Sequence, residues 1–226
     1  MLNRSLRSIA FSLLMVCAAG MVMLIWQNRE SINDAGVETA VQPIRLLVIG
    51  DSISNGHGLA VPWPTLLAKR LSLDVINHSV SGEQTAWGLS QVDSTLAKHK
   101  PTHVMIMLGT NDVTKSASLE SSLQNLQAMA DRVNSSGALA YLSTVLPIPG
   151  ERYAKFNQRA ADLSDGIFSL AGIEVVDVRA RFVEPVALLA DGLHPNQQGQ
   201  ELIADTFIEV LSLSDQSTQP NPTRKG

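Results

Sequence analysis

Residues 44–54 read Ile-Arg-Leu-Leu-Val-Ile-Gly-Asp-Ser-Ile-Ser, an apolar run that ends in a short polar turn. A short run of aliphatic and β-branched residues closed by Gly50 is typical of a buried strand. The chain contains similar runs at Leu73–Asn77, His103–Gly109, Leu139–Val145 and Ile173–Val178. The sequence therefore predicts about five strands that are apolar on both faces.

The segments between these runs have the periodicity of amphipathic helices. One helical face is formed by Leu119, Leu123, Leu126, Met129 and Val133, which are spaced three or four residues apart. A last helix is expected from about Gln197 to Leu211. Strands that alternate with helices in this way form a mostly parallel sheet covered on both faces. We therefore predict an α/β fold, a three-layer α/β/α sandwich of the flavodoxin-like type.

Length and composition indicate one globular domain. The 226 residues are 45% hydrophobic, which is enough to bury a sizeable core. The net charge is −4 without a basic cluster, which argues against a nucleic acid partner. The only cysteine, Cys17, lies in the apolar N-terminal run, and His78, His99 and His103 have no metal-ligand spacing. We therefore predict that the folded part contains no metal site.

The N-terminus has the layout of an export segment. Ile9–Trp26 contains no charged residue and follows Arg4 and Arg7. At ~1.5 Å per residue this run is about 27 Å long, close to the thickness of the hydrocarbon layer of a membrane. The apolar residues continue beyond Ala18-Ala19-Gly20, which favours an uncleaved anchor over a cleaved signal. Either reading predicts an exported domain on the extracytoplasmic or periplasmic side.

Polar residues cluster directly after the predicted strands and before the last helix. The segments are Gly50-Asp51-Ser52-Ile53-Ser54, Ser79-Val80-Ser81-Gly82-Glu83, Gly109-Thr110-Asn111-Asp112 and Asp191-Gly192-Leu193-His194-Pro195. In open parallel sheets, functional groups gather where the carboxyl ends of strands meet loops. We therefore expect these segments to lie together.

Their side chains are those that acyl transfer requires. A serine hydroxyl becomes a good nucleophile when a histidine takes its proton and a carboxylate orients that histidine. Ser52, His194 and Asp191 can fill these three roles. The negative oxygen of the tetrahedral intermediate needs preorganised donors, and our candidates are the backbone N–H groups of Ser52 and Gly82 and the side-chain amide of Asn111.

These four segments resemble the SGNH (GDSL-type) serine hydrolase family from about Arg45 to Leu211. Gly-Asp-Ser-Ile-Ser corresponds to the first motif, with Ile53 in place of Leu, and Gly82, Gly-Thr-Asn-Asp and Asp-Gly-Leu-His-Pro correspond to the other three. The sequences Trp63-Pro64-Thr65-Leu66-Leu67 and Val80-Ser81-Gly82-Glu83-Gln84-Thr85 are similar to those of an exported bacterial acyl-CoA thioesterase, lysophospholipase and arylesterase group.

The resemblance implies a monomeric esterase without metal or other cofactor that acts on acyl esters or thioesters, including lipid-like ones. It also implies a flexible, acyl-accepting groove. Thr110 replaces the Gly usual in that group, so the loop conformation and the chain-length preference need not be the same. The expected organisation is an N-terminal signal or membrane anchor over residues 1–28, a linker over 29–43, the hydrolase domain over 44–212 and a flexible tail over 213–226.

Two other functions fit parts of the sequence. The same catalytic residues would serve an esterase that removes O-acetyl groups from envelope or extracellular carbohydrate. A catalytically silent module could hold phosphate or metal at Gly50-Asp51-Ser52, although the chain lacks a P-loop lysine and pairs Asp191 with His194. Single residues also have structural interpretations: we expect His57 to be a loop residue, Asp112 to make local hydrogen bonds, Trp63 to be a core residue and Pro147–Phe156 to line the groove.

Overall fold

The computed structural model of this chain describes residues 43–58 and 60–217. The predicted N-terminal anchor, all of the linker before Pro43 and most of the predicted tail lie outside these residues. Within the two described ranges, no helix is both long and apolar enough to cross a membrane.

A five-stranded parallel sheet forms the middle layer, in the order β2-β1-β3-β4-β5. The strands are β1 (Arg45–Gly50), β2 (Asp74–Ser79), β3 (His103–Met107), β4 (Leu139–Ser143) and β5 (Glu174–Val176). The sheet confirms the predicted fold class. β3 ends two residues earlier than the apolar run that predicted it, because Gly109 takes a φ of 122° and begins the next helical turn.

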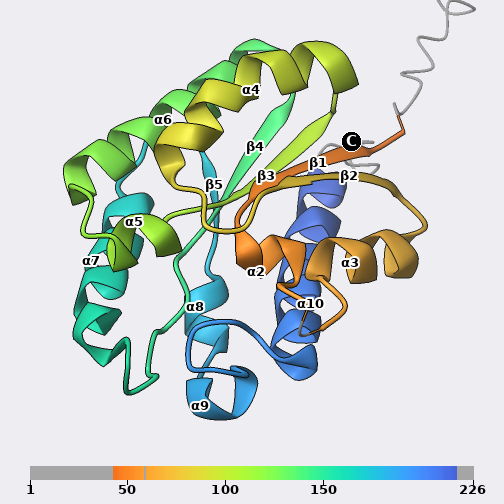
Figure 1. Cartoon of the computed structure of the whole chain (residues 1–226). Helices are drawn as coiled ribbons and strands as arrows, with labels where there is room; N and C mark the ends of the chain where they lie inside the picture. The colour runs from red at the N-terminus through yellow and green to blue at the C-terminus, as the bar shows by residue number, and fades with distance from the viewer. Residues whose placement is uncertain (1–42, 59, 218–226) are drawn as a thin grey trace, which may run out of the picture. The chain divides into compact units, whose positions relative to one another are not determined.

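Helices cover both faces of the sheet (Figure 1). One face carries α4 (Thr85–His99), α6 (Leu119–Ser135) and α7 (Asn157–Phe168), and the other carries α3 (Trp63–Leu71), α8 (Val178–Arg181) and α10 (Gln197–Ser217). Short elements lie in the connections: α2 (Ser52–Asn55), α5 (Thr110–Thr114), α9 (Pro185–Leu188) and the 3₁₀ turn η1 (Ala154–Phe156). α10 continues to Ser217, beyond Leu211, where the apolar pattern in the sequence ends.

Each face of the sheet has its own apolar core. Leu47 and Ile49 of β1 pack among residues of α4, α6 and α7, whereas Leu46 and Val48 pack with residues of α3 and α10. Successive side chains of a strand point to opposite faces. A strand buried on both sides must therefore be apolar throughout, which explains the continuous run in β1.

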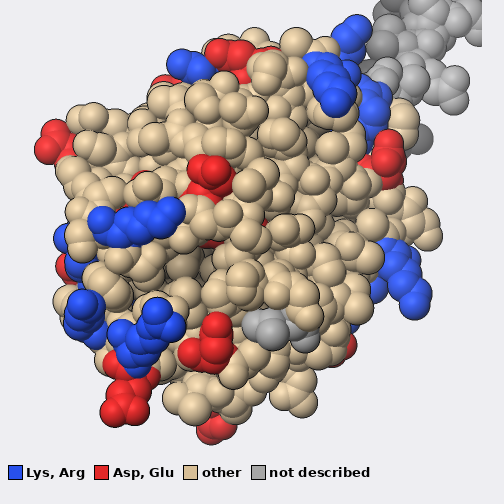
Figure 2. Space-filling model, in the orientation of Figure 1, with Lys and Arg blue, Asp and Glu red and all other residues tan. Residues whose placement is uncertain are grey.

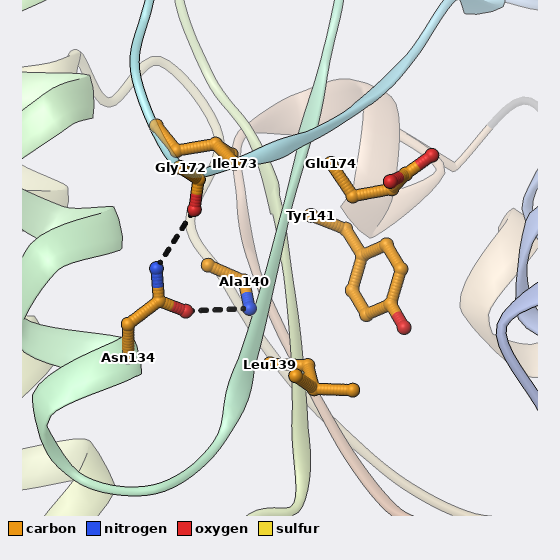
Figure 3. A pocket seen from close by; sticks show the side chains of 7 residues that line it. All are labelled: Asn134, Leu139, Ala140, Tyr141, Gly172, Ile173 and Glu174. Carbon is orange, nitrogen blue, oxygen red and sulfur yellow. Dashed lines mark hydrogen bonds between the residues drawn. The ribbon is translucent and has the colours of Figure 1, made fainter. Parts of the chain in front are cut away.

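Because all five strands are parallel, their carboxyl ends meet at one edge of the sheet. α2 follows β1 directly and α5 begins shortly after β3 at this edge. The opposite edge has a cavity of about 370 Å³ beside the first residues of β4 and β5. Figure 3 shows the side chain of Asn134 between Gly172 and Ala140. Its amide nitrogen donates a hydrogen bond to the carbonyl of Gly172, and its amide oxygen accepts one from the N–H of Ala140. These bonds join the end of α6 to β4 and to the turn before β5, and the cavity lies at the far edge from Ser52.

The packing of the two cores predicts that two leucine-to-alanine substitutions lower the free energy of unfolding by very different amounts. Leu47→Ala removes a fully buried side chain and should lower the free energy of unfolding by about 3 kcal/mol. Leu139→Ala is the matched control, because Leu139 also lies in a strand but is 49% exposed; its cost should stay below about 1 kcal/mol. Urea denaturation measures both values. Equal losses in the two variants would contradict this packing.

Candidate active site

Ser52 is the first residue of α2, directly after the turn that ends β1. The side chain of Asp51 caps this helix by accepting a hydrogen bond from the N–H of Ile53 at 2.9 Å. Gly50 leaves no room for a side chain, since a Cβ there would lie 2.5 Å from Ser54 Oγ. The sharp turn thus depends on glycine and places the Ser52 hydroxyl at the carboxyl edge of the sheet.

α2 is fastened to the rest of the domain by buried polar side chains. Gln200 of α10 donates to the carbonyl of Ile53 at 2.9 Å and accepts from the N–H of Trp63 at 2.8 Å. Trp63 donates through Nε1 to Ser54 Oγ and stacks on Phe207. Trp63 is a core residue, as expected. The sequence analysis did not identify Gln200, because one glutamine on a helix carries no signal of burial.

The structure brings the three predicted triad residues together. Ser52 Oγ lies 3.0 Å from His194 Nε2, and His194 Nδ1 lies 2.8 Å from Asp191 Oδ2. Ser52 is 7% exposed and the His194 side chain 13%, so the Ser52–His194 bond is largely shielded from water, whereas the Asp191 side chain is 44% exposed. The arrangement can move a proton from the serine hydroxyl to an imidazole whose other nitrogen faces a carboxylate.

The loop Asp191-Gly192-Leu193-His194 is shaped by its own carboxylate. Asp191 Oδ1 accepts hydrogen bonds from the N–H groups of Leu193 and His194 at 3.0 and 2.7 Å. Gly192 takes a φ of 79° and packs against the backbone of Gly150, so the loop that begins at Pro147 borders the site. Partial burial raises the pKa of Asp191, but the hydrogen bonds from His194 and Leu193 outweigh burial and leave that pKa below its ordinary value.

Two of the predicted oxyanion donors, Gly82 and Asn111, belong to segments that are joined to each other and to α2, which carries the third, Ser52. Asn55 donates to Ser81 Oγ at 3.3 Å, and Lys115 Nζ donates to the carbonyl of Gly82 at 2.6 Å. Among the described residues, no hydrogen bond engages the N–H of Gly82, and that of Ser52 lies in the first turn of α2, where helical N–H groups lack helical acceptors. Both N–H groups therefore remain candidates for binding an oxyanion.

Asn111, the third predicted donor, is already engaged. Its amide nitrogen donates to Asp51 Oδ2 at 3.1 Å and to the carbonyl of Glu83 at 3.0 Å. An amide has two N–H donors, and both are used here. If the amide were flipped, the Asn111 oxygen would face Asp51 Oδ2 and the carbonyl of Glu83, which are also acceptors. The hydrogen bonds therefore fix the orientation of the amide. Asn111 must therefore share or exchange one of these bonds to reach a substrate oxygen.

Asp51 is fully buried and interacts electrostatically with His194. Burial raises the pKa of Asp51 to about 6, although the hydrogen bonds from Ile53 and Asn111 and the attraction of His194 lower it. The structure shows the same carboxylate capping α2 and holding Asn111.

Asp112 makes more than local bonds. It accepts hydrogen bonds from the N–H and the hydroxyl of Thr85 at 3.0 and 2.6 Å, and from Ser122 Oγ at 3.0 Å. These residues belong to the first turns of α4 and α6. Asp112 therefore fixes the start of α4, directly after the Gly82 segment.

His57 is a site residue that the sequence reasoning placed in a loop without a role. Its ring lies flat against the ring of His194, with 4.2 Å between centroids and 6° between planes. No spacing in the sequence signals this contact. In the described part of the chain, no group of three or more His, Cys, Asp or Glu could hold a metal ion.

The face that carries α2 and α5 has no single sign of charge. Figure 2 shows it in the orientation of Figure 1: side chains of Lys, Arg, Asp and Glu lie mostly toward its periphery, and uncharged residues form most of its centre. Such a surface suits a substrate whose reacting part is uncharged.

Known proteins are similar to this chain in sequence and in fold. A model described as the GDSL-like Lipase/Acylhydrolase family matches residues 48–202. The arylesterase of Vibrio mimicus is 32% identical over 180 residues, which cover 74% of this chain and 88% of that protein. Thioesterase 1/protease 1/lysophospholipase L1 of Escherichia coli strain K12 is 26% identical over 172 residues, with 74% and 82% covered. The crystal structure of TesA has a TM-score of 0.61 at 30% identity and covers 75% of this chain and 98% of that one.

The raised pKa of Asp51 predicts how stability depends on pH. Between its ordinary pKa of 3.8 and its value of about 6, the folded protein holds a proton that the unfolded chain has released. Stability due to this group is therefore complete below pH 4 and is lost as the pH rises through 6, by up to roughly 3 kcal/mol. The side chain in Asp51→Asn does not titrate. The free energy of unfolding of this variant, relative to that of wild type, should therefore increase by that amount from pH 4 to pH 7. Urea denaturation at each pH tests this, and a constant difference would contradict it.

Proposed function

This chain belongs to the GDSL-like lipase/acylhydrolase family, as its motifs predicted, and on that premise we propose how its residues carry out the reaction. The protein is a carboxylic ester hydrolase. We propose Ser52 as the nucleophile, His194 as the general base and Asp191 as the carboxylate that orients the histidine. The observation that carries the proposal is the hydrogen-bonded path from Ser52 Oγ through the His194 ring to Asp191.

In the first half of the proposed reaction, His194 Nε2 takes the proton of Ser52 while Oγ bonds to the carbonyl carbon of the ester. The carbonyl oxygen becomes an oxyanion, which the N–H groups of Ser52 and Gly82 and the amide of Asn111 stabilise. When the intermediate collapses, the bond to the alcohol or thiol breaks and the leaving group receives the proton from His194. The acyl group is then an ester of Ser52.

The second half repeats these steps with water. His194 removes a proton from the water molecule, whose oxygen attacks the acyl carbon, and a second oxyanion forms at the same donors. Its collapse breaks the bond to Ser52 Oγ, and His194 returns the proton to the serine. Asp191 stays ionised throughout, which is consistent with its lowered pKa.

For the natural substrate we propose lipid-like acyl esters or thioesters, including lysophospholipids. The Vibrio relative is named an arylesterase, and the Escherichia coli relative a thioesterase and lysophospholipase. The uncharged N-terminal run after Arg4 and Arg7 supports export to the periplasmic or extracytoplasmic side, with residues 1–28 as anchor or signal and residues 29–43 as linker. We propose that residues 44–212 act there as a monomer and that the tail begins after Ser217, where α10 ends.

The proposed substrate class predicts a chain-length profile. Initial rates should be measured on p-nitrophenyl esters from acetate to palmitate, using residues 29–226 and the Ser52→Ala variant. We expect an optimum at medium or long chains and a loss of at least about 10³-fold in Ser52→Ala. Sharp restriction to acetate would favour the carbohydrate O-acetyl esterase over the lipid-directed enzyme. Undiminished turnover in Ser52→Ala would refute the role of Ser52.

The orienting role of Asp191 gives a second prediction. Asp191→Asn can still accept the N–H bonds of Leu193 and His194, but its amide would face His194 Nδ1 and favour the wrong tautomer. We expect kcat to fall by about 10³- to 10⁴-fold with an unchanged circular dichroism spectrum. Asp131→Asn, an exposed change on α6, is the control and should keep wild-type kcat. Normal kcat in Asp191→Asn would mean that another group orients the histidine.

A further inference from the structure

The two hydrogen bonds of His194 restrain its ring most strongly within the plane of the ring. They hold Nδ1 and Nε2, on different sides of the imidazole. Hydrogen bonds to ring nitrogens lie near this plane, so they resist displacement along it more than a tilt out of it. A contact with the face of the ring resists that tilt, and His57 makes such a contact at a centroid distance of 4.2 Å and an angle of 6°.

The backbone that presents His57 is unusual. Gly56, His57 and Gly58 have φ values of 79°, 46° and 72°, so a non-glycine residue lies between two glycines in left-handed backbone. Such a conformation is unfavourable for most side chains and persists where surrounding structure enforces it. A Cβ at Gly56 would lie 2.8 Å from the carbonyl of Ala60, which shows how tightly the turn closes.

The loop that carries His57 is fastened to the helix that follows His194. The N–H of Val61 donates to Gln197 Oε1 at 3.1 Å, and the N–H of Trp63 donates to Gln200 Oε1 at 2.8 Å. Both glutamines lie in the first turns of α10. The two stacked rings therefore belong to segments that are joined to the same helix, α10.

We propose that His57 is a positioning residue for His194, a role that rests on the proposed function. Its ring keeps the plane of the His194 ring aligned with Ser52 while the proton is transferred. Each half of the reaction gives His194 a positive charge, and the face of an aromatic ring attracts a cation. In this role His57 takes no part in the proton transfers and forms no bond to substrate.

Two substitutions separate the ring of His57 from its backbone. His57→Asn keeps a residue that tolerates left-handed backbone but removes the ring. His57→Phe keeps a flat ring that cannot carry a proton. We expect His57→Asn to lower kcat by roughly five- to tenfold with KM changed less than about twofold. His57→Phe should restore kcat to within about twofold of wild type. The assay uses the preferred p-nitrophenyl ester, and thermal unfolding is recorded for each variant.

The controls separate the failure of this role from the failure of the proposed function. His99→Asn, at the end of α4, should keep wild-type kcat, and Ser52→Ala should be inactive. Wild-type kcat in His57→Asn would overturn the role of His57, and so would an equal loss in His57→Asn and His57→Phe. Full activity in Ser52→Ala would instead refute the proposed function, and with it the role assigned to His57.

Discussion

The buried carboxylate of Asp51 is the group on which the arrangement of the site depends. One of its oxygens caps α2, the helix that begins with Ser52, and the other holds the amide of Asn111 at the start of α5. These helices have four and five residues, too few to be stable alone. Burying this carboxylate is costly, as its raised pKa records. The hydrogen bonds from Ile53 and Asn111 offset part of this cost, and through them one group sets the positions of the nucleophile and of a candidate oxyanion donor.

The parallel sheet explains how distant residues meet. β1 lies between β2 and β3, so the segments that follow these three strands adjoin one another at the carboxyl edge. His194 reaches them from 142 positions further along the chain than Ser52, through the loop before α10. Gln200 then locks α10 to α2 and α3. The site thus joins both helical layers through buried hydrogen bonds.

The fold and the meeting of the four polar segments at one edge of the sheet could be predicted because they leave local signals. Continuous apolar runs identify doubly covered strands, and glycines beside Ser52 and His194 mark turns that admit no other residue. The remaining features depend on tertiary contacts. The stack of His57 on His194, the burial of Gln200 and the reach of Asp112 to α4 and α6 arise only when separate segments pack together. The engaged state of Asn111 is of the same kind, since its two acceptors come from different turns.

Because both N–H groups of the Asn111 amide already donate hydrogen bonds within the protein, this amide should bind the substrate and the transition state with different strengths. In the proposed mechanism, a substrate carbonyl that accepts a hydrogen bond from Asn111 would have to replace Asp51 or the Glu83 carbonyl as the acceptor. A neutral carbonyl gains little from that exchange, whereas a full negative charge forms a much stronger bond. The amide would thus contribute little to ground-state affinity and most at the transition state. Differential binding of this kind raises kcat without increasing the affinity for the substrate.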